Sequence, residues 1–380
     1  MEITWIQILW FILVGVLWTG YLILEGYGLG TGMLLHILGK NDQERGQMVR
    51  AIGPHWDGNE VWLLTAGGAT FASSPEWYAV MFSGMYLALL LILFCLILRI
   101  SAIEWRNKIN TLAWRSRWDM LQSISAWLVP VLLGVAFGNL VSGMKIAIVD
   151  PKAPFTPLAA GDIDLSRDVH NLIGYEGVPF GPFLSLLTPY GVLGGLTIAA
   201  LALTSGALFL SLKTEGVVRE RAEAFAPKAG LIATVLTAAF AVWGQLVYAG
   251  PAALFGWIFL VIAALGLVAG LLFSFQKSFG KAFIFHSAGI AFAVAWVFAM
   301  LYPYVMKSSI DTELYSLTIA QSAASGSTQL VMTIAAVILV PVVLGYTIWS
   351  VYMFRARITT VQDAGLEPSK VREGASFLVG

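Results

Sequence analysis

Long apolar runs recur along the chain and set its first structural prediction. Eight stretches of about 20 or more mostly apolar residues lie at 5–24, 77–98, 120–143, 183–211, 229–249, 253–273, 283–304 and 329–354. A helix needs roughly 20 such residues to cross the hydrocarbon core of a bilayer. The runs lack the alternation of barrel strands, and backbone amides in lipid must be bonded within their own segment. The pattern therefore predicts an all-α, polytopic membrane protein.

A ninth segment, at about 54–75, is less clear because it opens with the polar residues 54–60 and turns apolar only afterwards. The distribution of Lys and Arg favours it as a span, since these residues concentrate on the inner side of a membrane. With nine spans and an outer N-terminus, 18 of the 22 basic residues fall inside, against 15 without the ninth span. We therefore predict a bundle of nine transmembrane helices over residues 1–355, with the N-terminus outside and the C-terminus inside.

Two segments outside these spans differ from the spans in composition. The longest loop, at about 144–182, lies outside in this topology and is rich in Asp and Pro, so we expect an irregular outer cover. Residues 356–380 lose the apolar pattern and are expected to form a flexible cytoplasmic tail. No Lys or Arg precedes the first apolar run, so we expect no cleaved signal peptide.

The composition supports the membrane prediction and excludes several functions. Hydrophobic residues make up 58% of the chain, charged residues 12%, and the 22 basic residues balance the 22 acidic ones. A neutral chain has no basic field for nucleic acid, so we exclude nucleic-acid binding. The single cysteine, Cys95, excludes an internal disulfide and a cysteine metal cluster.

Three acidic residues lie at the predicted inner ends of the first two spans. Glu25 ends the first run, while Asp57 and Glu60 open the weak one. An ionised carboxylate at membrane depth is costly unless it is paired, hydrated or protonated, so such a group is a candidate proton carrier. A structural role is also open. Glu25 could be hydrated at the interface, Asp57 could cap its helix, and Glu60 could bond a neighbouring helix.

The glycines between the first two spans and the histidines suggest no cofactor site. Residues 26–32 contain a GxGxG string, but no strand precedes it, so a phosphate site is disfavoured. The same glycines form two interleaved GxxxG pairs, which favour close helix packing. The four histidines are scattered along the chain, and their spacing gives no facing pair for haem or metal.

The polar segment belongs to a motif that resembles subunit II of the cytochrome bd-type quinol oxidases. Residues 52–63 read IGPHWDGNEVWL, and the resemblance continues through residues 66–72, 78–86 and 134–140 and the late STQL string at 327–330. It also includes a cytoplasmic-edge motif formed by Arg99, Glu104, Arg106 and Lys108. The match is specific in the first 140 residues; beyond them it rests mainly on hydropathy, span count and the STQL string.

The resemblance implies one subunit of a bacterial cytoplasmic-membrane complex that oxidises quinol, reduces O2 to water and generates a proton gradient. It implies that the haem-bearing subunit I carries haem b, haem d and the quinol site, and that this chain ligates no haem or metal. Small accessory subunits, and a quinone or lipid bound to this chain, are further expectations. Transferred residue by residue, the resemblance makes Asp57, Glu25 and Glu60 the proton path.

The residues around that path are expected to position it. By the same resemblance, Trp56, Asn59 and Trp62 hold Asp57, with His55 and Tyr27 beside them. The family's first-span motif usually reads acid-Gly-Phe-Asp-x-Gly, whereas this chain has Gly28 where the second acid stands. We therefore expect a less charged entrance that relies on Glu25, Asp57 and water.

Two other functions remain as alternatives. A proton-coupled secondary transporter would also use buried carboxylates, and a purely structural assembly subunit would use the same acids as helix caps. Dependence on a partner separates a transporter from an oxidase subunit. A carrier buries its polar groups within its own fold, whereas half of an oxidase is unstable alone.

Overall fold

The computed structural model describes residues 2–150, 153–163, 170–172 and 181–360, and most of them are helical. Eight helices of this part are long and apolar enough to cross a membrane, in agreement with the eight predicted runs. They are α1 (Trp5–Leu38), α5 (Tyr86–Trp105), α6 (Leu112–Ser142), α8 (Pro189–Lys213), α9 (Gly216–Val247), α10 (Ala253–Phe275), α11 (Phe279–Leu301) and α14 (Gly326–Met353).

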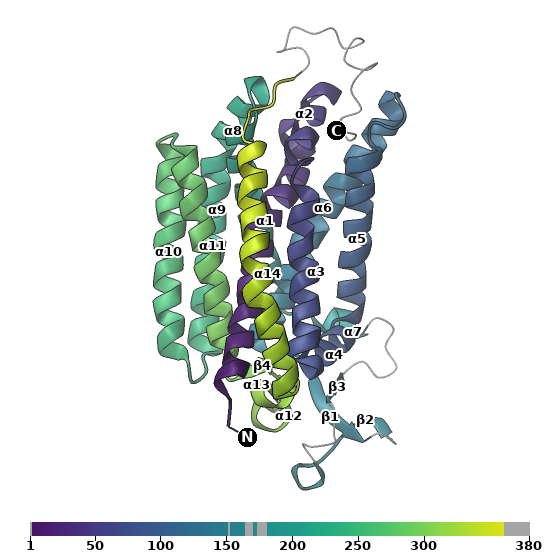
Figure 1. The fold of residues 1–380 in the computed structure, drawn as a ribbon, viewed down its shortest axis with the longest axis vertical. Coiled ribbons are helices and arrows are strands. Elements are labelled where there is room, and N and C mark those ends of the chain that lie inside the picture. The colour runs from purple at the N-terminus through teal and green to yellow at the C-terminus, as the bar shows by residue number, and fades with distance from the viewer. Residues whose placement is uncertain (1, 151–152, 164–169, 173–180, 361–380) are drawn as a thin grey trace.

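The weak ninth segment also forms a helix, α3 (Trp56–Ser73), but it does not meet the same hydropathy criterion. Its 18 residues span about 27 Å at 1.5 Å per residue, which is close to the thickness of a hydrocarbon core. It lies among the long helices and packs on α1 (Figure 1). A short polar helix, α2 (Asp42–Ile52), precedes it. Asn41 caps the start of α2, where its side chain accepts a hydrogen bond from the Glu44 backbone N–H at 2.8 Å.

The run predicted at 77–98 is not one helix. A short helix, α4 (Pro75–Gly84), occupies its first part, and α5 begins only at Tyr86 and continues to Trp105. Met85 separates the two, with backbone angles outside the helical region. An unbroken apolar pattern does not reveal this break, because Met and its neighbours suit either conformation. The predicted boundaries were therefore wrong, and residues 99–105 belong to the helix.

Three helices form the centre of the bundle. Helix α1 packs on α6 and α8, and α6 also packs on α8. Helices α3 and α5 lie on one side of this centre, with α9, α10 and α11 on the other (Figure 1). Helix α14 lies across α1 and α3, and Gln329 is its single buried residue. The Gln329 side-chain amide donates to the Ser73 backbone carbonyl. The Gln329 backbone carbonyl accepts a hydrogen bond from the Trp10 indole N–H.

Glycines allow the central helices to approach closely, which confirms the packing interpretation for Gly30 and Gly32 but not for Gly28, whose Cβ site faces the side chains of Glu25 and Arg99. Residues 26–32 lie inside α1, so no phosphate loop forms there. A Cβ at Gly30 would overlap the carbonyl oxygen of Ala202 on α8, and one at Gly206 would overlap the backbone of Gly30. Gly134 of α6 and Gly194 of α8 meet in the same way.

Small sheets cover the end of the bundle at which α1 begins. Strands β1 (Ile146–Asp150), β2 (Ala153–Pro157) and β3 (His170–Leu172) form an antiparallel sheet in the order β2-β1-β3. A second pair joins β4 (Tyr304–Met306) to β5 (Leu317–Thr318), and short helices complete the cover: η1 (Ala160–Asp162), α7 (Gly181–Ser185), α12 (Thr312–Tyr315) and α13 (Ile319–Ser322). The expectation of an irregular loop is corrected here, because the buried apolar residues 146–149 favour a strand.

The chain beyond α14 returns to the opposite end of the bundle. The Ile358 N–H donates to the Lys213 carbonyl at 2.8 Å, and the Ile358 carbonyl accepts the Gln47 amide at 2.6 Å. These bonds hold the first residues of the predicted tail against α2 and the end of α8. The remainder of that predicted tail, 361–380, lies outside the described residues.

Close packing at Gly30 gives a testable prediction. Gly30→Ala should lower the free energy of unfolding of the detergent-purified protein by about 1–3 kcal/mol, and with it the melting temperature. Backbone atoms on α8 cannot move aside for a methyl group. Gly67→Ala on α3 is the matched control. A Cβ there meets nothing within 4 Å, so the helix should be unchanged or gain up to about 1 kcal/mol. Equal melting temperatures for both variants would contradict the packing account.

Candidate functional site

A buried ion cluster joins three helices in the half of the bundle formed by α1, α3 and α5. The Arg99 guanidinium, from α5, is fully buried and contacts two carboxylates. Its Nη2 forms an ion pair with Oε1 of Glu25, from α1, and its Nη1 lies 3.2 Å from Oε2 of Glu60, from α3. Glu25 is fully buried and Glu60 is 8% exposed. We call these three residues the acid–arginine cluster.

Gly28 makes room for this cluster on α1. It follows Glu25 by almost one turn, so the two residues share a face. A Cβ at Gly28 would lie 2.8 Å from Glu25 Oε1 and 2.9 Å from Arg99 Nη2. The acid that the resemblance expects at this position would therefore compete with Glu25 for Arg99. In this chain Arg99 pairs with Glu25 and Glu60 alone among the described residues.

Polar groups next to the cluster connect α1 to α3. The Asn59 amide donates to the Leu24 carbonyl and to the Tyr27 hydroxyl, both at 2.9 Å. The Tyr27 ring stacks on Phe209 at 4.3 Å and meets the His55 ring edge-on. Asn59, Tyr27 and His55 are all buried. They therefore fix the start of α3 against α1, and their predicted role in positioning the proton path stays a prediction.

Asp57 does not join the cluster. It lies in the first turn of α3 with its side chain exposed, while Glu60, three residues on, points into the bundle. Trp56 and Trp62 are half-buried, and the Trp62 ring covers Gly20 of α1. Of the three predicted path acids, the structure therefore brings Glu25 and Glu60 together and leaves Asp57 at the surface one turn away.

The residues of the predicted cytoplasmic-edge motif separate in the structure. Arg99 lies inside α5 and pairs with the path acids, whereas sequence reasoning assigned it to an inner loop because it ends an apolar run. Arg106 is buried just beyond the end of α5. Glu104 is half-buried and Lys108 is exposed. The signal that was missed is the position of Arg99 at the end of an apolar run, which allows it to pair with Glu25 and Glu60 at the ends of two other predicted spans.

Arg106 belongs to a second ion network, which we call the inner clamp. Its Nε donates to Asp119 of α6 at 2.6 Å, and its Nη2 donates to Asp42 of α2 at 2.8 Å. Arg45 also donates to Asp119, at 2.9 Å, and Arg115 donates to Asp42, at 2.8 Å. Asp119 is fully buried. The clamp ties α2, the end of α5 and the start of α6 into one rigid corner.

The charges of the inner clamp shift the pKa of Asp42. Partial burial alone would raise the pKa of this carboxyl above its ordinary value of 3.8, but the guanidiniums of Arg106 and Arg115 outweigh burial and lower it. The ionised form of the Asp42 side chain is therefore more favoured in the folded protein than in the unfolded chain.

The histidines form no metal site in the part of the chain that the structure describes, where no group of three His, Cys, Asp or Glu residues meets. His286 is buried, and its Nε2 lies 3.1 Å from both the Leu201 carbonyl and the Ser205 hydroxyl. His36 is exposed, and the His170 side chain lies outside the described residues.

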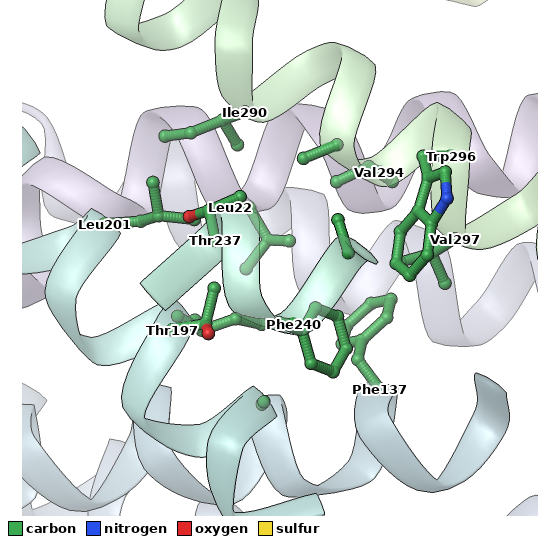
Figure 2. Close-up of a pocket in the computed structure, with 15 residues that line it drawn as sticks. Leu22, Phe137, Thr197, Leu201, Thr237, Phe240, Ile290, Val294, Trp296 and Val297 are labelled. Atoms are coloured by element: carbon green, nitrogen blue, oxygen red, sulfur yellow. The ribbon is translucent and has the colours of Figure 1, made fainter. Parts of the chain in front are cut away.

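A small cavity lies where the central helices α1, α6 and α8 meet α9 and α11 (Figure 2). Its volume is about 50 Å³, and its walls come from α1, α6, α8, α9 and α11, with Leu22, Phe137, Phe240, Ile290, Val294 and Trp296 among them. The Thr197 and Thr237 hydroxyls at its edge donate to backbone carbonyls of their own helices. The cavity is therefore apolar, and it is far below the roughly 300 Å³ at which pockets for drug-sized ligands begin. A quinone or lipid site stays a prediction.

The inner clamp predicts a large loss of stability when its central acid is removed. Asp119→Asn leaves Arg106 buried without its main counter-charge and should cost about 3–5 kcal/mol in the free energy of unfolding. Glu220→Gln, an exposed change on α9, is the control and should stay within about 0.5 kcal/mol. Thermal unfolding in detergent measures both, and equal stability of the two variants would refute the clamp.

The lowered pKa of Asp42 predicts a specific pH dependence. A depressed folded-state pKa stabilises the protein above the ordinary value of 3.8, and that contribution disappears as the pH falls through the lower, folded-state pKa. Wild-type protein should therefore be more stable than Asp42→Asn at pH 7, and the difference should shrink below about pH 4. Melting temperatures across this range test it; a constant difference would show that Asp42 does not titrate in this way.

Known proteins similar to this chain point to one family. The family model described as cytochrome bd terminal oxidase subunit II matches residues 6–354. The cytochrome bd ubiquinol oxidase subunit 2 of Bacillus subtilis (strain 168) is 36% identical over 357 residues, which cover 92% of this chain and 96% of that protein. The cytochrome bd-I ubiquinol oxidase subunit 2 of Escherichia coli (strain K12) is 36% identical over 93% of this chain and 95% of its own length.

A solved structure shares the fold. A chain from the bd oxidase of Geobacillus thermodenitrificans superposes with a TM-score of 0.64, covering 92% of this chain and 97% of its own length at 17% sequence identity. The fold, the family match and the two relatives agree with the resemblance that the WDGN motif carries. The chain is a member of the cytochrome bd terminal oxidase subunit II family, part of a membrane-bound oxidoreductase complex.

Proposed function

We propose that this chain, paired with a haem-bearing subunit I, carries protons from the cytoplasmic side toward the site of oxygen reduction in a quinol:O2 oxidoreductase. The observation that supports this role is the acid–arginine cluster, which holds two carboxyl groups on one buried guanidinium. Charged groups at this depth are expensive and are usually functional.

The charges of the cluster favour a bound proton. Two carboxylates and one guanidinium leave one negative charge without a partner, and a buried unpaired charge is strongly unfavourable. One proton on Glu25 or Glu60 makes the cluster neutral. The cluster can therefore hold a proton and release it when a neighbouring charge changes, which is what a relay requires.

The order of the acids gives the route a direction. Asp57 is exposed to water at the first turn of α3, and Glu60 lies one turn further into the bundle. Arg99 holds Glu60 and Glu25 on one guanidinium, which accepts no proton itself, so the transfer between the two carboxyl groups is direct or through water. The fully buried Tyr21 hydroxyl lies on α1 one turn before Glu25. Protons would enter at Asp57, pass to Glu60 and reach Glu25.

The quinol site and the haems belong to the partner in this proposal. Neither buried histidine fits a haem, because His286 Nε2 is already bonded and the His55 ring is enclosed by the rings of Tyr27, Phe209 and Phe354. We therefore derive no electron-transfer step within this chain. The relatives are named as ubiquinol oxidase subunits, which supports a quinol as the electron donor of the complex.

The proposed topology keeps nine transmembrane helices in the bacterial cytoplasmic membrane, with the N-terminus outside and the C-terminus inside. Helix α3 supports the ninth crossing by its length and by its place against α1. Helix α1 begins at the end of the bundle opposite to the one at which α14 ends (Figure 1). An odd number of crossings produces this arrangement. The apolar surface of α14 is available for lipid, for subunit I or for a small accessory subunit.

Substitution of the path acids tests the proposal. In the purified two-subunit complex, Glu25→Gln should lower quinol-driven O2 consumption at least about tenfold, because a carboxyl group that relays protons is removed while the haems are untouched. Asp57→Asn should lower it less, since water can still reach Glu60 from the exposed turn. Haem absorption spectra should remain those of the wild type.

The matched control is Glu220→Gln, which removes an exposed acid of α9 far from the cluster. Its turnover should equal that of the wild type. Glu25→Asp, which keeps the carboxyl group, should retain more activity than Glu25→Gln. Wild-type turnover in Glu25→Gln would remove the cluster from the proton route.

A further inference from the structure

Helix α6 carries a line of buried polar side chains that the proposed route does not use. Asp119, Gln122 and Ser125 follow one another at intervals of three residues, and none is more than 1% exposed. The Gln122 amide oxygen and nitrogen and the Ser125 hydroxyl have no hydrogen-bond partner among the described residues. Three unpartnered polar groups along one buried line are unusual, because nearly all such groups in proteins are bonded to protein or water.

The line points toward the acid–arginine cluster. Helices α1 and α6 pack side by side, and α6 begins at the end of the bundle where α1 ends (Figure 1). Gly32 of α1 faces the segment of α6 from Gln122 to Ala126, since a Cβ there would lie 2.6 Å from the Ala126 Cβ and 3.8 Å from the Gln122 Cγ. Ser125 therefore lies near the level of Gly32, and Gly28 is four residues, or about 6 Å, further along α1.

Gly28 is the position closest to the centre of the cluster. Its Cβ site lies within 3 Å of both Glu25 Oε1 and Arg99 Nη2. Arg99 Nε and Glu25 Oε2 also lack a hydrogen-bond partner among the described residues. Unsatisfied groups on α1 and α5 therefore lie about one helical turn beyond the level of Ser125.

At its other end the line meets the inner clamp. Both carboxylate oxygens of Asp119 accept bonds from Arg106, and one also accepts from Arg45. The Arg45 side chain is 18% exposed, so this corner of the bundle reaches the surface. The line thus extends from a surface-accessible corner to within about one helical turn of the buried cluster.

We propose that Gln122 and Ser125 bind a file of water molecules between α1, α5 and α6, and that this file is a second proton entrance to the acid–arginine cluster. Buried water bonds to polar groups that the protein leaves unsatisfied, and these side chains supply donors and acceptors along the line. The inference rests on the proposed function, because it requires that the cluster relays protons.

The chemistry of the file is proton transfer alone. Each water accepts one proton from the water before it and releases one to the next, so no electrons move and no bond to carbon changes. The Ser125 hydroxyl both donates and accepts, so it can pass a proton itself. Gln122 is a positioning residue, because its amide can orient water but does not exchange protons readily. Asp119 fixes the mouth of the file.

Two parallel entrances make a prediction that neither makes alone. Asp57→Asn slows the first entrance, so a larger share of the remaining turnover depends on the second entrance, with the rest carried by water that reaches Glu60 directly. In the intact complex, Ser125→Ala and Gln122→Leu should each have a small effect when Asp57 is present. When either change is combined with Asp57→Asn, O2 consumption should fall by a further factor of about five or more. This factor is below the contribution that a positioned proton-transfer group usually makes.

The solvent isotope effect distinguishes a proton file from packing. When proton entry limits turnover, the ratio of rates in H2O and D2O should rise in Asp57→Asn/Ser125→Ala above the ratio in Asp57→Asn. Asp57→Asn/Ser123→Ala is the matched control, because Ser123 lies on the same helix but is only half-buried. Its rate and isotope ratio should equal those of Asp57→Asn. Asp57→Asn/Ser125→Thr, which keeps the hydroxyl, should restore most of the rate.

The outcomes separate this inference from the function on which it rests. Unchanged turnover and isotope ratio in Asp57→Asn/Ser125→Ala would overturn the file, while a loss in Glu25→Gln would leave the cluster as the relay. Normal turnover in Glu25→Gln would overturn both. Ser125→Ala removes a single oxygen atom, so it decides the question even if the Gln122→Leu protein does not assemble.

Discussion

One buried guanidinium organises the functional half of this protein. Arg99 can lie inside the bundle only because Glu25 and Glu60 compensate its charge, and those acids can lie there only because Arg99 is present. Removing Arg99 would leave two acids without a counter-charge at membrane depth. The positions of α1, α3 and α5 therefore depend on the same contact that the proposed proton relay uses.

The residues around the cluster hold its three helices in place and leave space for the guanidinium. Gly28 leaves the space that the Arg99 guanidinium needs, and Gly30, two residues later, brings α8 against α1. Asn59 holds the start of α3 so that Glu60 points inward and Asp57 outward. The inner clamp fixes the corner where α2, α5 and α6 meet. The two ion networks thus lie in separate places, the inner clamp at the edge of the bundle and the acid–arginine cluster inside it.

Much of the fold follows from the sequence because lipid imposes simple rules. Each of the eight apolar runs contains all or part of one long helix, and Gly30 of α1 makes a packing contact with α8. The break at Met85 and the strands after α6 were missed, because the same apolar residues suit several conformations. Arg99 was assigned to a loop, since a local pattern cannot show that its partners lie on two other helices. Asp119, Gln122 and Ser125 escaped notice for the same reason.

The central claim is that the acid–arginine cluster holds an exchangeable proton. Infrared difference spectroscopy of the intact complex, reduced minus oxidised, reports the carbonyl stretch of protonated carboxyl groups directly. The account predicts a carboxyl band that shifts in D2O and disappears in both Glu25→Gln and Glu60→Gln while the haem bands remain. A spectrum whose carboxyl region is identical in the wild type and both variants would contradict it.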